Sequence, residues 1–220
     1  MTTQTRSPRR TRHPSAPPRD MDASSFAQIL ADLVVRIPGA YGASLVDAQG
    51  ESVDYAGRVT PFDVKVAAAY WRIVLDDISR STLGVARSLI VRAASKSFMT
   101  YTLPDEYALV ILLTRRAGFA PATRALGACI RDLHVEAQWP LHDERGAWFA
   151  VTVACDARLR PTHVTGRAGA CHELEVMGAV QGLGERDRGF RVRLDSGKEV
   201  TLVREPGDFW YADEAVDVSK

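Results

Sequence analysis

Residues 36–51 read RIPGAYGASLVDAQGE and place Gly39 and Gly42 shortly before Ser44. Glycines at this spacing can form a loop that holds a phosphate, but such loops lie between a strand and the helix that follows it. Here an apolar stripe with helical spacing precedes the glycines, and a strand-like segment follows them. The order therefore predicts a helix that ends at Pro38–Gly39 and a strand that begins beyond it, rather than a nucleotide site.

The flanking sequence predicts a domain of mixed helices and strands. A capping box at Ser25 and Gln28 begins the first helix, and the turn Asp47–Gly50 joins the first two strands. The consecutive apolar residues Val110–Leu113 indicate a strand that is buried on both faces. We expect an α/β (α+β) domain, with a five-stranded, mostly antiparallel sheet and helices on both faces. Further strands are predicted at 88–93, 97–103 and 107–114, and further helices at 62–81 and 121–137.

The helix predicted at residues 62–81 has two apolar faces, whereas a surface helix needs one. A broad arc around Trp71 suits the core. A second apolar face needs a partner, most simply another copy of the helix or a partner protein. This second arc contains Phe62, Val66, Ala69 and Ile73. The charged side chains between and beside the arcs are candidates for partner contacts, and an ordinary solvated surface fits them equally well: Asp63, Lys65, Arg72, Asp76 and Asp77.

The pattern changes after residue 143 to short alternating strands, which are predicted at 148–154, 173–181, 190–194 and 199–204. We expect residues 144–220 to form a small all-β, barrel-like module beside a domain of residues 22–140. The aromatic run Phe209–Tyr211 is a stacking platform or, more simply, closes the β core.

The N-terminal residues 1–21 contain five arginines and no apolar stripe, so they are predicted to be a disordered basic tail. The tail is either a solvated leader or a basic arm for nucleic acid, lipid or an acidic partner. No aromatic residues are interleaved with the arginines, which favours the solvated leader and argues against nucleic acid as a partner.

The motifs argue against an enzyme, because neither a G-x-S-x-G elbow nor a phosphate-loop lysine motif occurs. Cys155, His163, Cys171 and His172 lie close in sequence, but their spacing fits no zinc motif. We expect no metal and no cofactor. Three cysteines, no signal peptide and no apolar run long enough to span a membrane lead us to expect a cytoplasmic protein.

Four segments together resemble the roadblock/LC7 family, and the resemblance covers about residues 22–138. They are RIPGAYGASLVDAQGE at 36–51, DVKVAAAY at 63–70, SLIVRAASKSFMTYTLPDEYALVILL at 88–113 and APATRALGACIRDLH at 120–134. The resemblance implies a homodimer in which the middle helices pair and the two sheets join through their third strands. It thereby adds Leu89 and Val91 to the expected interface.

The resemblance also implies binding of a small Ras-like GTPase without catalytic residues, as in bacterial polarity and motility regulators and in trafficking. We therefore expect a non-enzymatic, homodimeric regulator or scaffold for such a GTPase. The alternative is a protein–protein scaffold without GTPase contact, which recruits partners through residues 144–220 and the Arg-rich tail.

Overall fold

The computed structural model describes residues 18–117, 122–140 and 148–217. The N-terminal domain contains α1 (Ser25–Arg36), β1 (Ala40–Val46), β2 (Ser52–Gly57), α2 (Pro61–Arg80), β3 (Ser88–Arg92), β4 (Lys96–Thr102), the 3-10 turn η1 (Pro104–Glu106), β5 (Ala108–Thr114) and α3 (Thr123–Glu136). The C-terminal module contains β6 (Phe149–Cys155), β7 (Pro161–Thr165), β8 (Cys171–Val180), β9 (Arg188–Leu194), β10 (Glu199–Glu205) and β11 (Phe209–Ala212).

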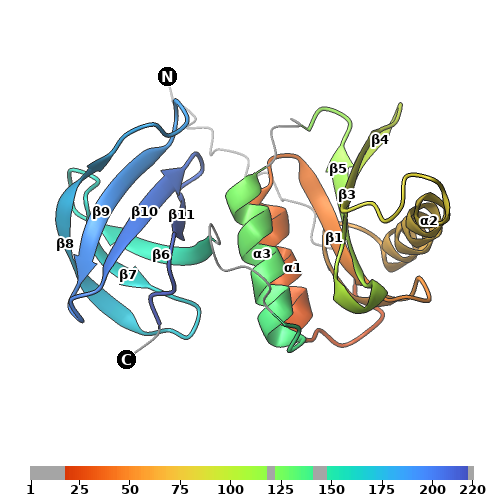
Figure 1. Cartoon of the computed structure of the whole chain (residues 1–220), viewed down its shortest axis with the longest axis horizontal. Helices are drawn as coiled ribbons and strands as arrows, with labels where there is room; N and C mark the ends of the chain where they lie inside the picture. The colour runs from red at the N-terminus through yellow and green to blue at the C-terminus, as the bar shows by residue number, and fades with distance from the viewer. Residues whose placement is uncertain (1–17, 118–121, 141–147, 218–220) are drawn as a thin grey trace, which may run out of the picture.

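The N-terminal domain is one five-stranded sheet in the order β2-β1-β5-β4-β3, and each pairing in it is antiparallel. Helices α1 and α3 lie on one face and α2 on the other (Figure 1). The central strand β5 is buried from Ala108 to Leu113, because helices cover both of its faces. This confirms the predicted mixed fold with an antiparallel sheet and helices.

The segment at residues 36–51 forms a helix end and the first strand. Gly39 adopts a φ of +84°, and a Cβ atom there would lie 2.7 Å from the Cβ of Ala117. Only glycine therefore fits this position without strain. At the other end of α1 the predicted cap is displaced by one residue, because Ser24 rather than Ser25 accepts a hydrogen bond from the N–H of Phe26 at 3.2 Å.

Two apolar cores lie on the two faces of the sheet. The core under α1 and α3 includes Leu30, Leu33, Leu45, Ile111 and Leu133. The core under α2 includes Val46, Val64, Trp71, Leu75 and Val110. Alternate residues of β1 and β5 enter opposite cores, as the two-residue period of a strand requires.

The C-terminal module is a closed, antiparallel barrel in the order β10-β11-β6-β7-β8-β9. Trp210 enters its core together with Val151, Val164, Val192 and Leu202. The sequence patterns did not predict β7, because this strand is only five residues long and begins with proline. Within the run Phe209–Tyr211, the central Trp210 closes the barrel core, and its two neighbours face the N-terminal domain.

The barrel packs directly against the α1 and α3 layer (Figure 1). Tyr211 of β11 is 0% exposed and belongs to the same apolar cluster as Leu30 and Leu133. The two parts of the chain therefore share a core. We call this contact the seam.

Candidate interaction surface

The outer face of α2 is apolar, and none of the described residues covers it. Thr60 caps the helix by accepting a hydrogen bond from the N–H of Asp63 at 3.1 Å, and Pro61 occupies its first turn. The inner face is buried, so the opposite arc points to solvent. Phe62 is 76% exposed, and the other large apolar side chains of this arc are exposed too. We call the exposed set the α2 stripe: Phe62, Val66, Tyr70 and Ile73.

Three of these side chains were predicted and Tyr70 was not. Tyr70 lies one helical turn beyond Val66, so the helical wheel contained the signal for it. Ala69, which was also predicted, is half-buried beside the stripe. It lines a shallow hollow of about 640 Å³ with Phe62, Val66 and neighbouring residues.

The apolar surface continues beyond α2 toward the edge of the sheet. Leu83, in the connection to β3, is 82% exposed, and Val85 is exposed as well. β3 is an edge strand that pairs with β4 alone among the described strands. The predicted interface residues Leu89 and Val91 are half-buried against the α2 core. β3 therefore offers a partner its unpaired backbone edge and the exposed side chain of Ile90.

The charged residues that were predicted to contact a partner do not all lie on the surface. Asp63, Lys65 and Asp77 are exposed, whereas Arg72 is buried. The Arg72 guanidinium donates to the carbonyl of Glu106 at 2.6 Å and also binds Asp76. These two residues therefore stabilise the fold rather than line a free surface.

Lys65 lies beside the α2 stripe and pairs with Asp20 at 2.8 Å. The hydrogen bond from Lys65 lowers the pKa of Asp20, and the same bond raises the pKa of Lys65. Asp77 has a weaker partner, because its carboxylate lies 3.9 Å from Arg80.

The opposite edge of the sheet, at β2, is covered by residues 18–21, which the sequence had placed in the disordered tail. Arg19 donates to the carbonyl of Tyr55, lies 4.4 Å from the centre of its ring and pairs with the buried Asp54. Ser24 donates to Asp54 through its backbone N–H at 2.9 Å. Burial alone would raise the pKa of Asp54, but these donors lower it below its usual value. The predicted tail residues 1–17 lie outside the described residues.

The α1 and α3 face is covered by the barrel through arginine contacts at the seam. At the start of α3, Arg124 pairs with Asp187 at 2.9 Å and Glu205 at 2.6 Å, and it lies 4.8 Å from the centre of the Trp148 ring. Burial would lower the pKa of Arg124, but the hydrogen bonds that it donates to the two carboxylates raise it.

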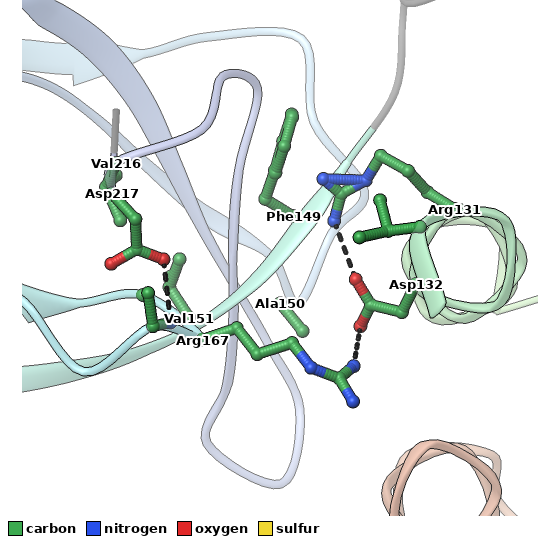
Figure 2. A pocket seen from close by; sticks show the side chains of 11 residues that line it. Arg131, Asp132, Phe149, Ala150, Val151, Arg167, Val216 and Asp217 are labelled. Atoms are coloured by element: carbon green, nitrogen blue, oxygen red, sulfur yellow. Dashed lines mark hydrogen bonds and ion pairs between the residues drawn. The ribbon is translucent and has the colours of Figure 1, made fainter. Parts of the chain in front are cut away.

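The other end of the seam encloses a cavity of about 330 Å³ (Figure 2). Asp132 binds Arg131 at 3.2 Å and Arg167 at 2.7 Å, while the Arg131 guanidinium stacks 3.3 Å from the centre of the Phe149 ring. Asp217 also lines this cavity and accepts a hydrogen bond from the backbone N–H of Ala168 at 3.1 Å.

The described residues contain no group of three or more His, Cys, Asp and Glu side chains that could hold a metal ion. His172 pairs with Asp195 at 2.8 Å, and Cys155 and Cys171 are exposed and unbridged. None of the described helices is long and apolar enough to cross a membrane. The cytoplasmic location stays a prediction.

No family model and no curated protein matches this chain. Similar solved structures include a roadblock/LC7 domain from Streptomyces avermitilis (18% identity, TM-score 0.47, 52% of this chain and 99% of that chain). They also include MglB of Myxococcus xanthus (15%, 0.44, 52% and 98%) and the gliding protein MglB of Thermus thermophilus (12%, 0.45, 57% and 100%). The element order from α1 to α3 is the order on which the sequence resemblance to roadblock/LC7 rests.

Proposed function

We propose that this chain is a non-enzymatic, homodimeric regulator or scaffold that binds a small Ras-like GTPase through its roadblock-type domain. The observation that carries the proposal is the uncovered α2 stripe beside the open edge of β3. An exposed apolar surface of this kind marks a protein–protein contact.

The position of the stripe supports self-association. Its residues recur at helical spacing along one side of α2, so two copies of the helix can pack side by side over its length. β3 is an edge strand of the sheet on which α2 packs. A second copy can therefore add its own strand there and extend the hydrogen-bonded ladder.

Two other surfaces of the N-terminal domain are covered, which limits where a partner can bind. Residues 18–21 cover the β2 edge, and the barrel covers the α1 and α3 face. The α2 side is thus the large apolar face that the described residues leave without a cover. A partner of the N-terminal domain would bind at this side.

The GTPase part of the proposal comes from the sequence resemblance. The exposed charges Asp63, Lys65 and Asp77 flank the α2 stripe and would surround a paired-helix interface. Such a rim sets partner choice and association rate more than affinity. A preformed surface of this type would act by favouring one nucleotide state of the GTPase.

Binding assays with Ras-like GTPases encoded beside this chain, loaded with GDP or a non-hydrolysable GTP analogue, test the proposal. We expect one state to bind, and we expect Asp77→Lys to weaken binding. Glu173→Lys makes the same charge change on the exposed barrel surface and serves as the matched control. Failure of either nucleotide state to bind would contradict GTPase recognition.

The alternative function is a scaffold that recruits another protein through the barrel and the Arg-rich tail. Deletion of residues 144–220 does not separate the two functions, because it would expose the core that Tyr211 shares with α1 and α3. Substitutions of exposed residues leave that core intact and are therefore better suited to separate the two functions. The scaffold would be favoured if the dimer binds no GTPase but binds another protein, and if Glu173→Lys abolishes that binding.

A further inference from the structure

One end of the barrel is rich in arginine. Consecutive strands of this barrel alternate in direction, so its β6–β7, β8–β9 and β10–β11 turns all lie at the same end. We call this the arginine end. These turns and the strand residues next to them carry Arg158, Arg160, Arg186, Arg188 and Arg204.

Most carboxylates at the arginine end are already engaged. Asp156 accepts the backbone N–H groups of its own turn at 2.8 and 2.9 Å, which lowers its pKa. Asp187 and Glu205 turn toward the seam and bind Arg124 there. Asp208 accepts from the Nε of Arg204 at 2.7 Å.

The guanidinium groups at this end outnumber the carboxylates that are left to pair with them. Arg158, Arg160, Arg186 and Arg188 are exposed and form no ion pair with the described residues. The same turns also carry the exposed carboxylates of Asp156 and Glu185. Like charges that gather at one end of a small module repel one another unless an anion binds between them. Four unpaired guanidinium groups against the two carboxylates of Asp156 and Glu185 leave this end with an excess of positive charge.

A small hollow at this end is bordered by three arginines. Arg188 and Arg204 lie directly opposite each other in the β9–β10 ladder, and with Arg186 and the segment 205–208 they border a hollow of about 190 Å³. Glu205 in that segment turns toward Arg124 at the seam. Arg204 is fixed there, because its Nε is bound to Asp208 and its side chain is only 26% exposed. A planar guanidinium held in this way suits a phosphate oxygen pair.

An apolar side chain stands at the tip of the same end. Leu159 is 48% exposed, lies between Arg158 and Arg160 in sequence and has a φ of +60°. An exposed leucine flanked by cations matches the border between lipid headgroups and acyl chains. Nucleic acid without base pairing would instead need exposed aromatic rings for stacking, and Trp210 is buried in the barrel core.

We propose that the arginine end docks on a membrane surface of anionic phospholipids, with a lipid phosphate in the hollow and Leu159 at headgroup level. The binding is peripheral and electrostatic, so it weakens as salt rises. Each arginine near such a surface strengthens binding by about fivefold. This role is independent of GTPase recognition.

Flotation of the full chain with vesicles tests the proposal. We expect binding to mixed phosphatidylcholine and phosphatidylglycerol vesicles and none to phosphatidylcholine alone. The double variants Arg158→Ala/Arg160→Ala and Arg186→Ala/Arg188→Ala should each lower the partition coefficient by about 25-fold. Leu159→Ala should lower it without any change of charge.

The matched control is Arg191→Ala/Arg193→Ala, which removes two arginines from the barrel wall, where both pair with Glu199. Residues 1–17 are the same in every variant, so a difference between variants reports on the barrel. An equal loss in the control double variant would overturn the proposal, as would no binding to anionic vesicles. Binding to single-stranded DNA but not to vesicles would assign the arginine end to nucleic acid instead.

Discussion

The contact of Asp54 with residues 18–24 gives the sharpest stability prediction. Asp54→Ala removes a fully buried carboxylate that binds Arg19 and the backbone N–H of Ser24. Breaking a buried ion pair costs about 3 to 5 kcal/mol, but the Arg19 side chain is partly exposed and can return to water. We therefore expect a loss of about 2 to 4 kcal/mol in the free energy of unfolding.

Urea unfolding at a fixed protein concentration measures this loss, because the stability of the proposed homodimer would depend on concentration. Asp47→Ala is the matched control. It removes an exposed carboxylate that accepts two turn N–H groups at 3.0 and 2.8 Å, and it should cost about 1 kcal/mol.

The same residue predicts a pH dependence. The pKa of Asp54 is lower in the folded chain than in the unfolded chain, so its stabilising contribution is present above the unfolded value, about 3.9. That contribution is lost as pH falls through the folded pKa, and the gap between wild type and Asp54→Ala should narrow on acidification. A loss below about 1 kcal/mol at neutral pH, or a gap that stays constant down to acid pH, would refute the reasoning.

Three other predictions concern the fold. Gly39→Val should destabilise the chain by at least about 2 kcal/mol in urea unfolding, since it adds strain at positive φ to a clash with Ala117; an unchanged midpoint would contradict this. Arg124→Ala should loosen the seam, leave Asp187 and Glu205 unpaired and speed proteolysis between α3 and β6; unchanged cleavage would count against a fixed barrel. Burial raises the pKa of the Cys129 thiol, so iodoacetamide at neutral pH should label the exposed Cys171 and leave Cys129 unmodified, and mass spectrometry of the peptides reads this out.

Features set by local sequence were predictable. The helix end at Gly39 and the turn at Gly50 follow from the need for positive φ, and the two-faced α2 follows from its periodicity. Ser24 and Ser25 are both capping residues by type, so composition alone could not place the cap.

Features set by long-range contacts were not predictable. Arg72 looked like part of a surface ridge, because a helical wheel cannot show that its long side chain reaches the carbonyl of Glu106. The seam joins Arg124, Trp148 and Glu205, which are distant in sequence and have no pattern in common. The covering of one face of the sheet by the barrel therefore became visible only in the structure.

The mass of the chain in solution tests the central claim most directly. Multi-angle light scattering should give twice 24.1 kDa for the wild type and 24.1 kDa for Phe62→Glu/Ile73→Glu. Val35→Glu places the same charge on an exposed apolar residue of α1 and should remain dimeric. A wild-type monomer, or a dimer that survives both changes in the α2 stripe, would contradict the account.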